Sequence, residues 1–104
     1  MELRGKYLAI WLQDAGARLF LGLPPKSTID SRWVVWGMAA EGGESMHGVW
    51  VEIDAIQERD PEAKVIKEWT VQPPIILVRW DWIISVQIAG REVKDAAQFG
   101  FRPI

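Results

Sequence analysis

The stretch IILVRWDWIISVQI, residues 75–88, decides the fold class of this chain. Its two ends, residues 75–80 and 83–88, are rich in the branched aliphatic residues that favour β-strands. Only Asp81 and Trp82 separate these ends, so the connection is a single tight turn between two strands. Alternation in the second strand predicts an inward aliphatic set and an outward polar set: Ile84, Val86 and Ile88 against Ser85 and Gln87.

Three more strands are predicted before the pair Pro73-Pro74, which forces an extended break in the chain. Residues 32–40 form the first, and residues 49–57 alternate between apolar and polar side chains as a half-buried strand does. Asp60-Pro61 begins a hairpin turn, after which residues 64–72 return antiparallel. A short helix with Asp60 as its N-cap is the alternative for that last segment, but its Trp, Thr and Val residues favour the hairpin.

The first 23 residues allow two interpretations. Residues 7–12 and 18–23 can pair as a hairpin around the turn Asp14-Ala15-Gly16. Alternatively, one face of a helix is marked by apolar residues at helical spacing: Leu8, Trp11, Leu12, Ala15 and Leu19. Gly5 and Gly16 weaken such a helix, so the two strands are favoured.

The two strands within residues 75–88 are similar to the closing strands of SH3-like and Sm-like small barrels. Those barrels close with a strand, a one-turn connection and a bent-back final strand, and Sm-like proteins carry an aliphatic-Arg-Gly-x-x-aliphatic motif there. Val78-Arg79-Trp80-Asp81-Trp82-Ile83 resembles that motif, with Trp80 in place of the glycine. The resemblance implies a mainly β fold, a small SH3-like or Sm-like barrel of five to seven strands that assembles edge to edge. Residues 93–99 are expected to add a short C-terminal helix.

The same resemblance carries over one RNA-contact position. The RNA-contacting loop of the Sm-like family is similar to an Asp-x-x-Met-Asn pattern. The matching region here, Glu52 to Ile56, contains no asparagine. Arg79 is therefore the position that transfers, and the resemblance implies assembly more than it implies RNA binding.

The composition describes one soluble globular domain. The chain has 104 residues, a formal net charge of −2 and a pI near 5.3, which does not favour nucleic acid or anionic lipid as a partner. Because it has no cysteine, disulfides, thiolate metal sites and cysteine nucleophiles are excluded. No apolar run is long enough to cross a membrane. A secretory signal is disfavoured because Asp14 falls where the cleavage region should be neutral, so we expect a cytoplasmic protein.

Acidic residues gather in one part of the chain. Residues 41–62 hold seven acidic side chains and one basic side chain: Glu41, Glu44, Glu52, Asp54, Glu58, Asp60 and Glu62, against Arg59. The first part of this segment, residues 41–48, is polar and rich in glycine and predicts a loop. We expect the whole acidic segment to be a solvated hairpin.

Catalytic motifs are weak. His47 is the single histidine, and a metal or acid–base site could be drawn from it with Glu41, Glu44 and Ser45. A glycine-rich loop does not promise the converging ligands that such a site needs, so we expect an exposed histidine. Gly43-Glu44-Ser45-Met46-His47 also misses the nucleophile elbow, because Gly48 comes one position late. We therefore expect no enzyme, no cofactor and no metal, and an enzyme centred on His47 is the weakest alternative.

Tryptophan is the most unusual feature of the composition, with seven against one tyrosine and three phenylalanines. Residues 33–38 carry apolar side chains on both faces of a strand, and such a strand must be covered by something. Trp50 shares its face with Glu52 and Asp54, away from the expected core. The sequence therefore predicts that some tryptophans are exposed and mark a contact surface. The alternative is that the N-terminal segment and the C-terminal helix cover the second face within the chain.

The candidate contact residues are four tryptophans and one arginine: Trp33, Trp50, Trp80, Trp82 and Arg79. The favoured hypothesis is a non-catalytic binding or assembly module that is a homo-oligomer or has a protein partner. The alternative is binding of single-stranded RNA through Arg79, Trp80 and Trp82, since bases stack on aromatics beside a cation. Arg32 beside Trp33 repeats this pairing, but the acidic net charge and the lack of a basic cluster disfavour nucleic acid.

Overall fold

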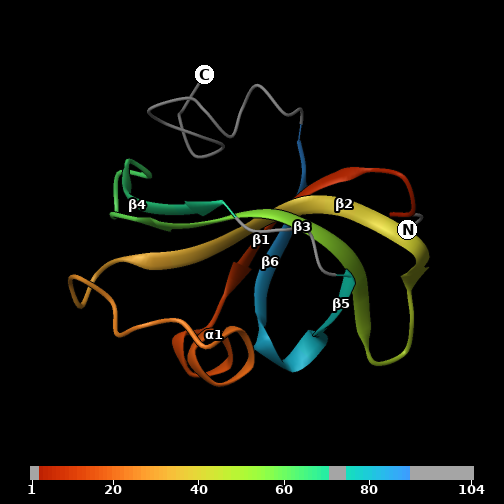
Figure 1. Cartoon of the computed structure of the whole chain (residues 1–104), viewed down its shortest axis with the longest axis horizontal. Helices are drawn as coiled ribbons and strands as arrows, with labels where there is room; N and C mark the ends of the chain where they lie inside the picture. Colours follow the sequence, from red (N-terminus) through yellow and green to blue (C-terminus); the bar gives the residue numbers. More distant parts are fainter. Residues whose placement is uncertain (1–2, 71–74, 90–104) are drawn as a thin grey trace.

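The computed structural model describes residues 3–70 and 75–89, which form one antiparallel sheet with an α-helix and a short 3-10 helix (Figure 1). In chain order the elements are β1 (Tyr7–Leu12), α1 (Asp14–Leu21), β2 (Arg32–Glu44), β3 (Gly48–Arg59), β4 (Val65–Thr70), β5 (Ile75–Arg79), η1 (Trp80–Trp82) and β6 (Ile83–Ile88). The mainly β class predicted from the sequence is confirmed. The helix expected at residues 93–99 lies outside the described residues.

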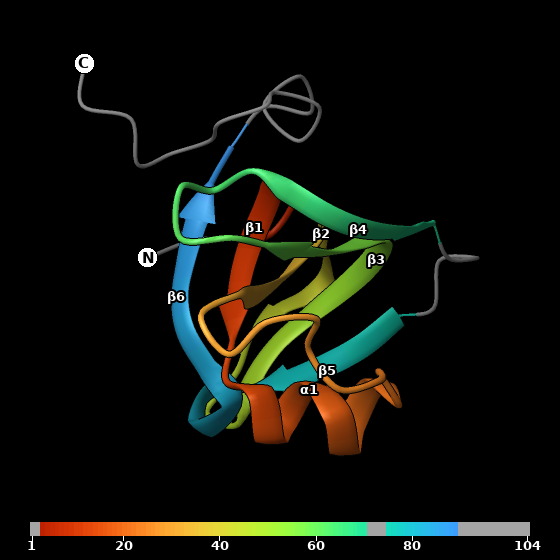
Figure 2. The same ribbon diagram turned by 90° about the vertical axis from the view of Figure 1, so that its left-hand side faces the viewer.

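Five of the six strands follow the order β4-β3-β2-β1-β6, and the sixth, β5, pairs with β3 off this path. The long strand β3 makes this possible because residues 55–59 pair with β4 and residues 48–52 pair with β5 along the same edge. The sheet curls, and α1 lies at one end of it, where Gly16 packs against Trp82 of η1 (Figure 2). Among the described strands, β6 pairs with β1 alone, so the sheet is open and a closed barrel is not established.

The main core lies on the concave face of the sheet. Buried residues from four strands meet there with Ala17 of α1, including Leu8, Ile10, Val35 and Val51. Trp33 belongs to this core and is fully buried, so the expectation that it is an exposed contact residue is wrong. Its indole Nε1–H donates to the Asp14 carboxylate at 2.9 Å, which joins the buried ring to the first turn of α1.

A second cluster lies on the opposite face of β1 and β2. It consists of buried residues that alternate with those of the main core: Tyr7, Ala9, Trp11, Val34, Trp36 and Ala55. Tyr7 and Trp36 stack with ring centroids 6.0 Å apart, and the Trp11 indole donates to the Gln87 amide oxygen at 3.3 Å. Both faces of residues 33–36 are therefore buried, as the apolar pattern of this strand requires.

The N-terminal segment is a strand followed by a helix. The strand predicted at residues 7–12 is confirmed, whereas the strand predicted at residues 18–23 is wrong because α1 covers most of that segment. Ala17 and Leu21 of α1 pack against the main core, and this burial outweighs the helix-weakening effect of Gly16. Gly22 ends the helix in a left-handed conformation that glycine adopts readily. No helix within the described ranges is long and apolar enough to span a membrane.

The β2–β3 and β3–β4 turns differ in how well they agree with the prediction from the sequence. The loop expected at residues 41–48 shrinks to the turn Ser45–His47, because β2 continues to Glu44 and β3 begins at Gly48. The turn at Asp60 is a hairpin as predicted, since the Asp60 amide donates to the carbonyl of Lys64 at 2.9 Å.

Strand β6 departs from simple alternation at its start. Ser85 pairs with Trp11 and Ile83 pairs with Leu12, so Ile84 falls in a register shift between them. Ile84 is consequently 49% exposed, and the prediction that it faces the core is wrong. Val86 packs against the main core as predicted. Ile88, at the end of the strand, is more than half exposed and also departs from its predicted inward position.

The acidic segment is not fully solvated, because Glu58 is buried. Its carboxylate accepts hydrogen bonds from the Ser27 amide at 2.6 Å, from the Ser27 hydroxyl at 2.9 Å and from the Ser31 hydroxyl. Burial raises the pKa of Glu58, but these hydrogen bonds and one from Thr28 together lower it below the ordinary value. Glu58 thus anchors the connection between α1 and β2.

Candidate functional site

The pairing of β3 with β5 places two of the predicted contact residues, Trp50 and Arg79, on one exposed face. Trp50 lies directly opposite Leu77, Glu52 lies opposite Ile75, and Arg79 lies opposite Gly48. Trp50 is 38% exposed and Ile75 is 58% exposed. We call the outward residues of this strand pair the β3–β5 surface: Trp50, Glu52, Ile75, Leu77 and Arg79.

Trp50 is held on this surface by close contact with β2. A Cβ placed on Gly42 would come within 2.7 Å of Cδ1 of the Trp50 indole. The ring therefore lies against the backbone of Gly42, and a larger residue there would push it away. The glycine-rich end of β2 provides the space for a large aromatic side chain on an exposed sheet face.

Trp80, the first residue of η1, follows Arg79 of this surface and is hydrogen-bonded to the β2–β3 turn. Its backbone amide donates to the His47 carbonyl at 3.1 Å, and its indole Nε1–H donates to the Ser45 carbonyl at 2.8 Å. These two hydrogen bonds fix the ring while leaving 39% of the residue exposed. Met46, at the tip of the same turn, is also exposed.

Arg79 and Trp82, two residues of the RNA hypothesis, contact one another. The Arg79 guanidinium lies over the Trp82 ring, 5.6 Å from its centroid, and its Nε–H donates to the Asp81 carboxylate at 3.1 Å. Trp82 also packs against Gly16 of α1 and the main core, so it is half-buried. Trp82 is therefore already covered on more than one side, which reduces its value as a stacking platform for a base.

His47 belongs to the turn between the end of β2 at Glu44 and the start of β3 at Gly48. The histidine is exposed on the β2–β3 turn. The Ser45 hydroxyl accepts hydrogen bonds from the backbone amides of His47 and Gly48, so it stabilises the turn. No group of three or more His, Asp or Glu side chains in this part of the chain could hold a metal ion.

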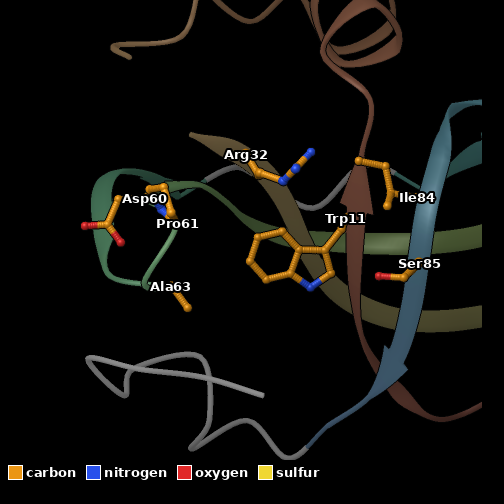
Figure 3. Close-up of a pocket in the computed structure, with 7 residues that line it drawn as sticks. All are labelled: Trp11, Arg32, Asp60, Pro61, Ala63, Ile84 and Ser85. Atoms are coloured by element: carbon orange, nitrogen blue, oxygen red, sulfur yellow. The ribbon is translucent and has the colours of Figure 1, made fainter. Parts of the chain in front are cut away.

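A pocket that sequence reasoning missed lies beside Trp11 (Figure 3). Its volume is about 360 Å³, and most of the surface that lines it is apolar. Its wall is formed by residues of β1, β2, β6 and the β3–β4 turn: Trp11, Arg32, Asp60, Pro61, Ala63, Ile84 and Ser85. In the sequence, Arg32 was considered together with its neighbour Trp33 as a cation beside an aromatic residue. The fold instead places Arg32 in the same pocket as Trp11.

A buried polar network holds the β3–β4 wall of this pocket in place. Arg59 is fully buried and donates to the Ala63 carbonyl at 2.6 Å and to the Gln57 amide oxygen at 2.8 Å. Its guanidinium also lies over the Trp36 ring, 5.7 Å from the centroid. Burial lowers the pKa of Arg59, and the charge of Glu68 opposes that shift. The turn is thus tied to the sheet by a buried cation.

Comparison with protein-family models, with curated proteins and with solved structures finds no match to this chain.

Proposed function

We propose that this protein is a non-catalytic assembly module that self-associates through the β3–β5 surface. The observation that carries the proposal is the direct pairing of Trp50 with Leu77 on an exposed sheet face. Tryptophan gives a large contact area with little loss of conformational freedom, so it commonly anchors protein interfaces. Ile75 extends the apolar area along β5.

A second copy of the chain is the favoured partner because the β3–β5 surface is self-complementary. Glu52 lies at one end of the surface and Arg79 at the other, with the Trp50–Leu77 pair between them. A two-fold axis through that pair would bring Glu52 of one copy near Arg79 of the other. Arg79 already pairs with Asp81 through Nε, but a guanidinium has further N–H donors for a second carboxylate.

We further propose that the fold is a small barrel of the SH3-like or Sm-like type. Its support is the path from β5 through the short η1 turn into β6, which then pairs with β1 at the far side of the sheet. This is the strand, one-turn connection and final strand by which such barrels close. The resemblance implies assembly, in agreement with the self-association proposed here.

Light scattering behind size exclusion, at low and high salt, tests the proposal. We expect a dimer that persists in high salt, because the centre of the contact is apolar. Ile75→Lys should give a monomer, whereas Ile88→Lys, a strand isoleucine of similar exposure outside the surface, should leave the dimer intact. A wild-type protein that stays monomeric at all concentrations overturns self-association.

A charge swap tests the two-fold arrangement itself. Arg79→Glu should weaken the dimer, because it places two carboxylates together across the axis. Adding Glu52→Arg to that variant should restore the dimer by reversing both charges. If the double variant associates no better than Arg79→Glu, Glu52 of one copy does not lie near Arg79 of the other.

Binding of single-stranded RNA through Arg79, Trp80 and Trp82 is the second candidate. The stacking of Arg79 over Trp82 supports it, while the net charge of −2 and the coverage of Trp82 weigh against it. RNA binding predicts an affinity that falls with added salt and with Arg79→Ala. Fluorescence anisotropy with a labelled single-stranded oligonucleotide measures both effects.

A further inference from the structure

We propose that the pocket beside Trp11 binds a small organic carboxylate with a flat apolar body. Arg32 would hold the carboxylate, and the Trp11 side of the pocket would hold the body. The site is independent of the β3–β5 surface, since the two share no residue. Its volume of about 360 Å³ falls at the small end of the range for ligand pockets.

Arg32 supplies an available cation. No hydrogen bond or ion pair of its side chain to another residue occurs in the part of the chain that the structure describes, and the residue is exposed. Arg32 lines the pocket, and Figure 3 shows its side chain above the Trp11 indole in that view. A guanidinium in this position can donate two parallel hydrogen bonds to one carboxylate.

The position of Arg32 in the sheet gives a second reason for an anion. Arg32 lies directly opposite Arg59 in the β2–β3 pair, and like charges in such a pair repel. The buried Arg59 is compensated by Glu68 and by the carbonyl of Ala63. Arg32 has no such compensation from a described residue, so a bound carboxylate would relieve the repulsion.

Among the described residues, no carboxylate forms an ion pair with Arg32. Asp60 borders the pocket, but its Oδ1 accepts hydrogen bonds from the backbone amides of Glu62 and Lys64, both at 2.9 Å. Its side chain points away from Trp11 and Arg32 (Figure 3). Asp30 and Lys26 line an adjoining depression that shares Arg32, where the Lys26 ammonium donates to the Ile29 carbonyl at 3.2 Å.

The remainder of the pocket suits a flat apolar group. Trp11 is nearly buried and contributes the indole, while Pro61 and Ala63 form the opposite wall (Figure 3). The register shift in β6 turns Ile84 outward to the rim, which explains an exposed isoleucine at this point of the sheet. The Ser85 hydroxyl is directed toward the indole and can donate to a polar substituent.

The proposal is tested by titrating the 15N-labelled protein with benzoate and following backbone amide and indole signals by NMR. Saturable shifts confined to Trp11, Arg32, the β3–β4 turn and the start of β6 are expected. Benzamide keeps the ring without the charge, and acetate keeps the charge without the ring, so both should bind at least about tenfold more weakly. Shifts scattered over the whole surface, or equal binding of benzamide, would overturn the proposal.

Two variants separate the role of Arg32 from a general loss of charge. Arg32→Gln should weaken benzoate binding by about tenfold or more without lowering the unfolding midpoint, because it removes the repulsion with Arg59. Lys6→Gln changes the net charge equally, away from the pocket, and should leave the affinity unchanged. Equal affinity in the Arg32→Gln variant, or no saturable binding to the wild type at about 10 mM benzoate, counts against the site.

Discussion

The indole of Trp82 lies directly against the backbone of Gly16. A Cβ built on Gly16 would be 2.6 Å from Cγ and 2.7 Å from Cβ of Trp82, closer than atoms can approach. Trp82 belongs to η1, which leads from β5 into β6, and Gly16 lies in α1. Gly16, which argues against a helix in the sequence, is therefore the residue that lets α1 approach η1 closely.

We expect Gly16→Ala to destabilise the protein although alanine is the better helix former. Overpacking costs about 1–3 kcal/mol, which exceeds the gain in helix propensity of about 1 kcal/mol. In a Trp82→Leu background, where the space is larger, the same change should become neutral or stabilising. Urea unfolding of the four proteins measures the difference, and a stabilising effect in the wild-type background would contradict the packing described here.

The two tryptophans Trp33 and Trp50 should respond differently to truncation. Trp33 is fully buried, so Trp33→Ala should lower the free energy of unfolding by about 3–5 kcal/mol. Trp50 is 38% exposed, and Trp50→Ala should cost about 1–2 kcal/mol and leave the fold intact. Urea unfolding at a protein concentration where association is negligible compares them. Equal losses would mean that Trp50 is part of the core.

Glu58 should make the free energy of unfolding depend on pH in the acidic range. Its pKa is lowered in the folded state, so its stabilising contribution is complete above the ordinary value of 4.5 and is lost as the pH falls through the folded value. Glu58→Gln should cost about 2–3 kcal/mol at neutral pH and flatten this dependence, because the neutral amide loses the charge-assisted hydrogen bonds.

The control for Glu58 is Glu41→Gln, which makes the same chemical change at an exposed position of β2. It should leave both the stability and its acid dependence close to those of the wild type. Unfolding midpoints in urea, measured between neutral pH and about pH 3, give the comparison. If the two variants behave alike, Glu58 is not bound by Ser27 and Ser31 as described.

Part of the candidate site was predictable from local pattern. The alternation of residues 49–57 placed Trp50 and Glu52 on an outward face, and the turn at Asp81-Trp82 joined β5 to β6. The pairing of Trp50 with Leu77 was not predictable, because the register between strands separated by β4 depends on how the whole sheet assembles. The same holds for the pocket, whose walls come from four separate elements.

The sequence alone determined the local features of this protein: strands where branched and aromatic residues alternate, and a turn where Asp60-Pro61 fixes the backbone. These depend on neighbours along the chain, so they can be read from it. The tertiary structure alone decided that Trp33 and Glu58 are buried, that residues 18–21 are helical and that Arg32 faces Arg59. Burial, helix docking and cross-strand pairing depend on residues far apart in the chain, and their free energies exceed the local preferences that a sequence displays.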